Sequence, residues 1–224
     1  MFALVGVVTI WALGGCSSSG QGRLDQDPAE LSAGKARTWN FDQDPSDVLP
    51  QSWKGAETHG RGKEGVWRVV EDGAAKSKPK VLKLVTRNSG GTYNLCVLKH
   101  VRAGDLDLSV ALRADAGGED QGGGLLWRYH DANNYYVARV NPLEDNFRLY
   151  KVENGRRTQL HSASTNVRQG QWTTMRIVHV GDRIDCYLDG KLLIAGHDNT
   201  FGESGRIGLW TKADASTSFD DVKL

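Results

Sequence analysis

The chain has 224 residues, of which 39% are hydrophobic and 25% are charged, and its formal net charge is +1. This length suits one globular domain with a single core. The near-neutral charge, without a basic run or a glycine-rich phosphate loop, argues against a nucleic-acid-binding surface. Glycine is abundant, with 27 residues beside 5 prolines and 2 methionines, as in an all-β chain with many turns.

Residues 1–15 form an uncharged apolar run that ends in small residues just before Cys16. About 13 apolar residues match a signal peptide, because a membrane-spanning helix needs roughly 20. No Lys or Arg precedes the run, and a short buried N-terminal helix is the alternative. Residues 13–16, LGGC, resemble the bacterial lipobox. The resemblance implies that Cys16 is lipidated and anchors the domain to a membrane of the bacterial envelope, outside the cytoplasm.

Residues 16–36 are rich in Ser, Gly and Asp, and we expect a flexible tether there. The folded domain is predicted over 37–224. Its two cysteines, Cys96 and Cys186, both lie in apolar strand patterns. An exported compartment is oxidising and permits a disulfide, but two buried free thiols fit as well and are slightly favoured. Two cysteines without a matching His/Cys cluster do not make a zinc site.

Short strands are predicted along the whole domain, separated by Gly, Asn, Asp and Pro. Over 105–113, Leu and Val alternate with Asp, Ser and Ala, which is the two-residue period of a strand. An Asn-Gly pair at 154–155 is the strongest hairpin signal, and pairs at 181–182 and 189–190 mark two further tight turns. Trp53 opens a short piece, and the other strands are expected over 39–41, 66–71, 81–86, 93–101, 125–130, 135–141, 147–152, 158–163, 172–179, 183–188, 191–195, 206–212 and 218–224.

About thirteen short strands, with turn signals every 8–12 residues and no helical period, predict an all-β sandwich of two antiparallel sheets. The number of strands favours a jelly roll over an immunoglobulin fold.

Three segments, 123–151, 171–193 and 205–224, resemble the concanavalin A-like jelly rolls of the laminin G and glucanase kind. More narrowly, they resemble the bacterial 3-keto-disaccharide hydrolase domain family. In that family a hydrophobic hairpin bears an Asp-Gly turn, and a Gly-x-Ile-Gly-Leu strand leads into the last strand. The resemblance covers roughly Trp39 to Leu224. It implies a concanavalin A-like jelly roll with a carbohydrate partner, and it is more specific for the fold than for the activity.

The first candidate site is a row of polar and aromatic residues on the central strands and one later strand. In the jelly rolls that the chain resembles, one sheet is concave and often holds saccharide. Sugars need aromatic faces for their C–H surfaces and planar donors for their hydroxyls. The alternative is the solvated outer face of a sheet. The expected substrate-binding residues are Arg139, Arg148, Tyr136, Tyr150, Trp210 and Lys212.

The second hypothesis concerns acid–base chemistry. The sequence lacks the Glu-x-Asp-x-Glu strand of the glucanases, so retaining glycoside hydrolysis is not expected. A 3-keto sugar needs one base, because the C2 proton beside the ketone is acidic and its removal expels the C1 substituent. The catalytic hypothesis assigns His130 as the base and Arg128 or Arg148 as the partner of the enolate oxygen. The alternative is a structural or exposed strand histidine.

The third candidate is a structural Ca²⁺ site of the kind found in concanavalin-like sandwiches. Asp42, Asp44 and Asp47 lie in an N-terminal loop, and Asp220 and Asp221 lie in the last strand. Carboxylate oxygens suit Ca²⁺. Acidic loop residues next to proline also serve simply as turn formers. The predicted ligands are Asp42, Asp220 and Asp221.

The sequence thus predicts an exported, lipid-anchored and monomeric jelly roll that binds or hydrolyses glycosides on its concave sheet. A non-catalytic carbohydrate-binding module is one alternative. A laminin G-like protein-interaction module is the other.

Overall fold

The computed structural model describes residues 1, 36–60 and 62–224. The predicted signal peptide beyond Met1, the lipidation site Cys16 and all but the last residue of the predicted tether lie outside the described residues. Within the described part of the chain every regular element is a strand, and no helix is long and apolar enough to cross a membrane. The strands are β1 (Thr38–Trp39), β2 (Trp53–Glu57), β3 (Trp67–Glu71), β4 (Lys80–Leu84), β5 (Tyr93–Ala103), β6 (Leu106–Ala116), β7 (Gly123–Asp131), β8 (Asn134–Asn141), β9 (Asn146–Glu153), β10 (Arg156–Ser164), β11 (Trp172–Val180), β12 (Arg183–Leu188), β13 (Lys191–His197), β14 (Gly205–Lys212) and β15 (Ser216–Lys223).

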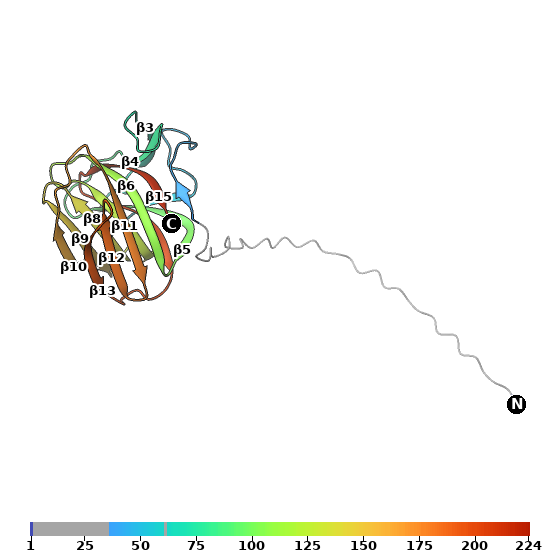
Figure 1. Ribbon diagram of the computed structural model, residues 1–224. Helices are drawn as coiled ribbons and strands as arrows, with labels where there is room; N and C mark the ends of the chain where they lie inside the picture. Colours follow the sequence, from blue (N-terminus) through green and yellow to red (C-terminus); the bar gives the residue numbers. More distant parts are fainter. Residues whose placement is uncertain (2–35, 61) are drawn as a thin grey trace.

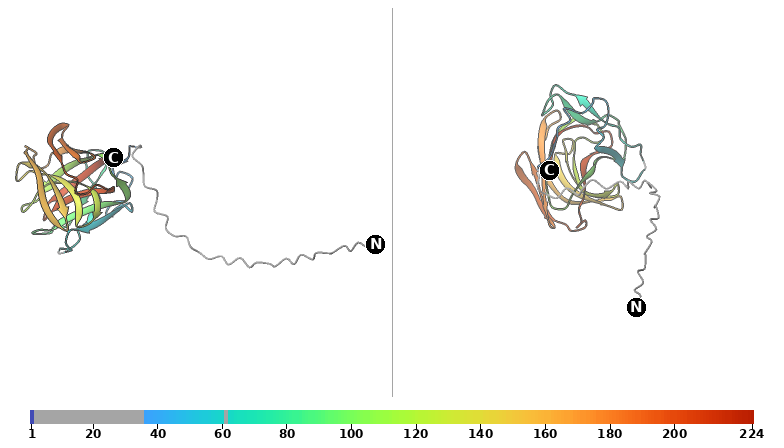
Figure 2. Two further views of the ribbon diagram at one scale, coloured as in Figure 1. Left: turned by 90° about the horizontal axis from the view of Figure 1, so that it is seen from below. Right: turned by 90° about the vertical axis from the view of Figure 1, so that its right-hand side faces the viewer.

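These strands form two antiparallel sheets packed face to face (Figure 1). Sheet A has the order β13-β12-β11-β6-β15-β4-β3, with β1 paired to β15, and sheet B has the order β10-β9-β8-β7-β14-β5-β2. Figure 2 shows the same two layers from two further sides, with bent strands in both views. The predicted all-β sandwich of two antiparallel sheets is confirmed.

The hairpin turns follow the sequence signals. Asn154 and Gly155 both have positive φ, 50° and 78°, and Asp189 and Gly190 have 47° and 79°. Two consecutive residues with positive φ make the turn whose twist matches that of the flanking strands, which explains the Asn-Gly and Asp-Gly pairs. The turn at 154–155 aligns β9 with β10 and therefore fixes which residues of β10 share a face with β9.

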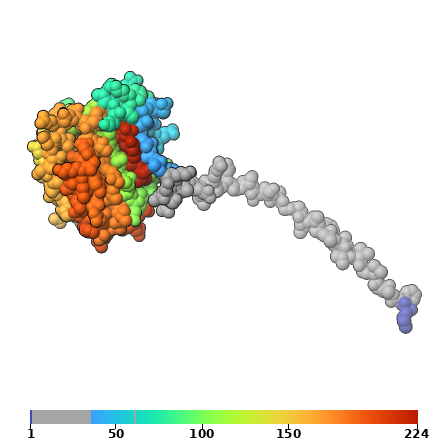
Figure 3. All heavy atoms as spheres, viewed as in Figure 1, coloured from blue at the N-terminus to red at the C-terminus, as the bar shows by residue number. Residues whose placement is uncertain are grey.

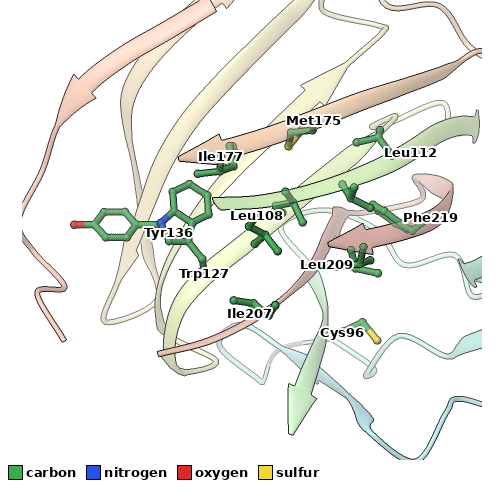
Figure 4. Close-up of a cluster of buried hydrophobic side chains, with 14 of the residues drawn as sticks. Cys96, Leu108, Leu112, Trp127, Tyr136, Met175, Ile177, Ile207, Leu209 and Phe219 are labelled. Atoms are coloured by element: carbon green, nitrogen blue, oxygen red, sulfur yellow. The ribbon is translucent and has the colours of Figure 1, made fainter. Parts of the chain in front are cut away.

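The core between the sheets is built by alternation along each strand. In β6, Leu106, Leu108, Val110 and Leu112 are buried and belong to the core cluster, whereas Asp107 is exposed. Figure 4 shows such side chains meeting from both layers, among them Leu108 and Met175 of sheet A and Trp127 and Leu209 of sheet B. The cysteines also lie here, Cys96 in sheet B and Cys186 in sheet A, and both are buried free thiols.

The alternation of β7 breaks at Arg128. Arg128 has φ of 44°, and the pairing registers of β7 with β8 and with β14 shift beside it. An extra residue of this kind turns the following side chains to the other face. Leu125 and Trp127 therefore point into the core, but Tyr129 packs on the opposite side of the sheet. A strict two-residue period would put Tyr129 on the same face as Leu125 and Trp127, and the bulge at Arg128 prevents this.

Sheet B is strongly curled towards its outer face. Strands β10 and β5 are five positions apart, which in a flat sheet means about 24 Å at ~4.8 Å per strand. Yet the guanidinium carbon of Arg157 on β10 lies 4.9 Å from the ring centroid of Tyr93 on β5. Two side chains cannot bridge the flat distance, so the sheet must bend around them. We call this outer side of sheet B the hollow face.

The outer face of sheet A is different. In the space-filling view β11 to β13, β6 and β15 form one continuous surface (Figure 3). Its charges are paired with each other, as in Arg176 with Asp107, whose side chains are 46% and 56% exposed. Such exposed pairs contribute little to stability. This is the solvated face that alternating strands normally present.

Candidate functional site

The hollow face carries a second buried cluster, separate from the core between the sheets. Its residues come from five strands of sheet B, and four of the nine are aromatic. The members are Leu95, Val97, Leu126, Tyr129, Tyr135, Val137, Tyr150, Val152 and Trp210. The outer face of an ordinary sandwich is polar and solvated. An aromatic cluster inside a curled sheet is therefore the first candidate for a binding site.

Three aromatic rings form the centre of this face. The ring centroids of Tyr93 and Trp210 lie 5.3 Å apart. The guanidinium carbon of Arg157 lies 4.4 Å from the ring centroid of Tyr150, 4.9 Å from that of Tyr93 and 5.8 Å from that of Trp210. A guanidinium over aromatic faces is attracted by their quadrupoles. We call Tyr93, Tyr150 and Trp210 the aromatic platform.

Tyr135 fixes the position of Trp210 within the platform. The indole Nε1 of Trp210 donates to the Tyr135 hydroxyl at 3.3 Å, and that hydroxyl lies 2.7 Å from Oγ1 of Thr58. Burial raises the pKa of Tyr135 well above its ordinary value, so its hydroxyl stays protonated. Because Thr58 follows β2 and Tyr135 belongs to β8, this chain of hydrogen bonds also holds the curl of the sheet.

A row of alternating charges runs beside the platform. Lys212 Nζ lies 2.8 Å from the Asp120 carboxylate, and Asp120 lies 3.9 Å from Arg139 Nη1. Arg139 Nη2 donates to both oxygens of Glu144 at 3.1 Å, and Arg148 Nη1 donates to Glu144 at 2.8 Å. Asp120 and Arg139 are each only 2% exposed. We call these five residues the charged row.

The Glu144 carboxylate of the charged row is held in the ionised form. Burial raises the pKa of Glu144, but a hydrogen bond from Asn146 and the charge of Arg139 outweigh it, so the pKa lies below its ordinary value. Asp120 accepts from Asn141 at 3.0 Å as well as from Lys212. Both carboxylates of the row are thus held in place by several donors.

Several buried nitrogens on the hollow face have no partner within the described chain. They are Nε and Nη1 of Arg139 and Nη1 of Arg157. A buried donor left unpaired costs about 1–3 kcal/mol, more when it is charged. Donors of this kind, aimed at one aromatic platform, are what a ligand rich in oxygen would satisfy.

Asp214 holds the loop that carries Asp120. Its carboxylate accepts the backbone N–H groups of Gly118, Glu119 and Asp120 at 2.8 to 3.0 Å. Burial raises the pKa of Asp214, but these three donors outweigh it and lower the pKa overall. Gly117, at φ of 146°, lets the loop turn there, because a Cβ would meet the carbonyl oxygen of Asp120.

The structure brings together five of the residues expected to bind substrate. Arg139, Arg148, Tyr150, Trp210 and Lys212 all lie on the hollow face, in the platform or the charged row. Tyr150 joins the two groups, because its hydroxyl lies 3.4 Å from Arg148 Nη1 and 3.5 Å from Arg139 Nη2.

Tyr136 lies on the other side of the same sheet. It is fully buried in the core, its ring stacks on Trp127 with 5.7 Å between centroids, and its hydroxyl donates to Asp198 at 2.5 Å. Figure 4 shows the two rings together. Because neighbours on a strand face opposite ways, Tyr135 rather than Tyr136 reaches the hollow.

The structure also separates His130 and Arg128 from the hollow face. The Arg128 guanidinium donates to the backbone carbonyls of Phe201 at 2.7 Å, Gly181 at 3.1 Å and Gly104 at 3.3 Å. The His130 ring lies 5.7 Å from that of Phe201, which belongs to the core. The bulge at Arg128 sends both side chains to the loop end of the sandwich. Their position favours a structural role, and the catalytic assignment of His130 and Arg128 stays a prediction.

The residues predicted to bind calcium are engaged with the backbone. Asp220 accepts from the N–H and the hydroxyl of Ser77 at 2.7 and 2.9 Å, and Asp42 accepts from the N–H of Lys80 at 3.2 Å. Asp221 lies beside Asp220, and its own N–H donates to that carboxylate. In residues 36–60 and 62–224 no three His, Cys, Asp or Glu side chains assemble as a metal site. Calcium binding stays a prediction.

Sequence reasoning missed Asp120, Arg157 and Tyr93. Arg157 could have been found, because the Asn-Gly turn pairs it with Val152, two residues from Tyr150 on the same face. Tyr93 and Asp120 had no local signal. They reach the site through the order of strands in sheet B and through the loop that Asp214 holds.

Comparisons with known proteins agree with this architecture. Residues of the chain match a levanase of Bacillus subtilis (strain 168) with 29% identity over 139 residues, 61% of this chain but only 20% of the levanase. The structure is similar to the carbohydrate-binding module CBM66 from Bacillus subtilis, with a TM-score of 0.62 and 22% identity, over 77% of this chain and 94% of the module. It is also similar to a native glycosidic hydrolase, with a TM-score of 0.55 and 14% identity, over 84% and 94% of the two chains.

The solved structures share the fold of this chain at low identity. The family is shown by a sequence model, which matches residues 42–224 and is described as a 3-keto-alpha-glucoside-1,2-lyase-like domain. The match takes in every strand from β2 to β15, and with them the platform and the charged row. The chain therefore belongs to the family of 3-keto-alpha-glucoside-1,2-lyase-like domains.

Proposed function

We propose that the domain binds a glycoside on the hollow face of sheet B and cleaves a 3-keto-glucoside there by elimination. The observation that carries the proposal is the position of the aromatic platform directly beside the charged row. Tyr150 belongs to the first and contacts Arg139 and Arg148 of the second. The expected lipid anchor on Cys16 would hold this site on the bacterial envelope, and that part remains a prediction from the sequence alone.

The two groups supply the two kinds of contact that a sugar ring needs. The C–H surface of a sugar packs on aromatic rings. Tyr93 is the half-buried ring of the platform, and Trp210, 1% exposed, supports it from beneath. Its hydroxyls and ring oxygen take hydrogen bonds from charged planar donors, which are stronger than neutral ones. The buried nitrogens of Arg139 and Arg157 that lack a hydrogen-bond partner in the described chain are the donors that we assign to this role.

The elimination needs a base and a donor for the enolate oxygen. The base takes the C2 proton, and the C2–H electrons form an enolate with the C3 ketone. Collapse of the enolate breaks the C1–O bond, the leaving group departs with the electron pair, and water then adds to the C1–C2 double bond. Asp120 and Glu144 are the carboxylates of the charged row that could accept the proton, and Lys212 and Arg139 are the donors that could stabilise the enolate.

A 3-keto-glucoside with a chromogenic leaving group tests the proposal. One of the two variants Asp120→Asn and Glu144→Gln, the one that removes the base, should lower kcat at least about a hundredfold, because general-base catalysis contributes ~10²–10⁴. Asp145→Asn is the matched control, since Asp145 is exposed in the same turn as Glu144 and forms no ion pair with any residue that the structure describes. Turnover that survives in both carboxylate variants would remove the elimination from this face.

A non-catalytic carbohydrate-binding module is the second candidate. One observation favours it: both carboxylates of the charged row are already paired with cations, which suits a fixed binding surface better than proton abstraction. Calorimetric binding of glycosides without any turnover of the 3-keto substrate would select this alternative.

A further inference from the structure

The hollow face holds more positive than negative charge. Its charged row contains Lys212, Arg139 and Arg148 against Asp120 and Glu144, and Arg157 on the platform adds a fourth cation. Four cations and two carboxylates leave two positive charges, 4 − 2 = 2, around the ring of Tyr150. Clefts with a surplus of one sign attract ligands of the other sign.

Arg157 is the one of these four cations that has no carboxylate partner in the described chain. Lys212 is paired with Asp120, and Arg139 and Arg148 are paired with Glu144. Arg157 forms no salt bridge with any residue that the structure describes, and its contacts are the three rings of the platform. Cation–π contacts hold the plane of the guanidinium but leave its N–H groups without acceptors, and Nη1 is buried and unpartnered.

Arg139, on the other side of Tyr150, also has guanidinium nitrogens that lack hydrogen-bond partners. It is 2% exposed, and two of its nitrogens, Nε and Nη1, have no hydrogen-bond partner. The 3.9 Å from Nη1 to Asp120 is an ion pair and too long for a hydrogen bond. The guanidinium carbon of Arg139 lies 6.0 Å from the Tyr150 ring centroid, and that of Arg157 lies 4.4 Å from it. Two planar cations with free donors thus face one ring.

We propose that the glycoside taken by the hollow face carries a carboxylate, as a uronic acid does, and that Arg157 and Arg139 hold it at Tyr150. This inference rests on the proposed function, since it concerns the ligand of the same face. A carboxylate is planar, accepts two parallel N–H groups from a guanidinium and neutralises the unpaired charge. A neutral sugar would fill the donors but leave the charge of the half-buried Arg157 guanidinium without a counterion.

Three methyl glycosides that differ at one carbon test the proposal by calorimetry: the α-glucuronide, the α-glucoside and the α-glucoside 6-sulfate. We expect the glucuronide to bind at least about tenfold more tightly than the glucoside, since a charge-assisted hydrogen bond is worth roughly that factor. Equal affinity, or preference for the neutral glucoside, overturns the carboxylate while the glycoside site stands. Preference for the sulfate over the glucuronide also overturns it. Binding of none of the three counts against the proposed function itself.

The variants Arg157→Gln and Arg156→Gln test whether Arg157 causes the preference for the glucuronide over the glucoside. Arg157→Gln should reduce the ratio of glucuronide to glucoside affinity about tenfold and flatten its dependence on salt, because an ion pair is screened as ionic strength rises. Arg156 is the adjacent residue on the same strand and is exposed, so Arg156→Gln should leave the ratio unchanged. A ratio that is the same in both variants would remove Arg157 from the site.

Discussion

The two faces of sheet B both hold buried side chains but are chemically unlike. On the inner face, Phe147 and Leu149 of β9 are 0% exposed and pack against sheet A. On the hollow face of the same strand, Tyr150 is 4% exposed and contacts three arginines. Burial therefore does not separate core from site in this domain. What separates them is the density of charges and of unpartnered donors, because a core excludes such groups unless they are satisfied.

Substitutions at two adjacent residues of β9, one on each face, are the strongest test of the difference between the faces. Leu149→Ala should lower the free energy of unfolding by about 2–5 kcal/mol, because it opens a cavity in the core between the sheets. Arg148→Gln, one residue away on the hollow face, should lower it by less than about 1 kcal/mol, since its pair with Glu144 is partly exposed. Chemical denaturation measures both.

In a binding assay the order of the two variants should be reversed, so that the variant with the smaller loss of stability shows the larger loss of affinity. Glycoside affinity should fall in Arg148→Gln and persist in folded Leu149→Ala. An Arg148→Gln protein that loses as much stability as Leu149→Ala would show that the charged row belongs to the structural core.

His179 provides a test on the inner side of the sandwich, because it is a titratable side chain in the core. It is 0% exposed, and its Nδ1 accepts from Trp127 Nε1 at 2.9 Å. Burial, with the nearby charge of Arg128, lowers the pKa of His179 from 6.5 to about 4. The unfolded chain therefore binds this proton at a higher pH than the folded one does. Stability is full above about pH 6.5 and falls as the pH drops towards 4, by roughly 2–3 kcal/mol in all.

Unfolding measured between pH 7 and pH 4 checks this expectation. Carboxylates with lowered pKa, such as Asp115 and Glu144, also lose stability at the acid end, so the His179 contribution is obtained by difference. His179→Gln keeps an acceptor for Trp127 but cannot titrate. The two proteins should diverge most between pH 6.5 and pH 4, and parallel curves would contradict the assignment. Binding at the hollow face at pH 7 should be the same in both.

Asp214 tests the hollow face with a smaller expected effect. Asp214→Ala removes the acceptor of three backbone N–H groups and should lower the free energy of unfolding by about 1–2 kcal/mol. Because the loop it holds carries Asp120, glycoside affinity should fall as well, although Asp214 is not part of the platform or the charged row. Asp214→Asn, which keeps one acceptor oxygen, should recover part of both. Lost stability with unchanged affinity would mean that Asp120 is placed without this loop.

The sequence by itself determined the strands, the turns and the division of each strand into two faces. A two-residue period and Asn-Gly or Asp-Gly pairs are local signals, and they placed Arg139, Arg148, Tyr150, Trp210 and Lys212 in candidate rows that the structure keeps together. Alternation also separates Tyr136 from Arg139, which are three residues apart on one strand, but it does not say which of the two faces curls inward.

Only the tertiary structure decided the contents of the site. The bulge at Arg128 turns the side chains at the end of β7 to the opposite face. It arises where the pairing registers of β7 with β8 and with β14 both shift, and the sequence of one strand does not predict such a shift. The meeting of Arg157 with Tyr93 needs the curl of sheet B across five strand positions, and the place of Asp120 needs the carboxylate of Asp214 from a distant loop. These contacts join residues far apart in the chain. They depend on how whole sheets bend and pack, and alternation along one strand carries no information about that.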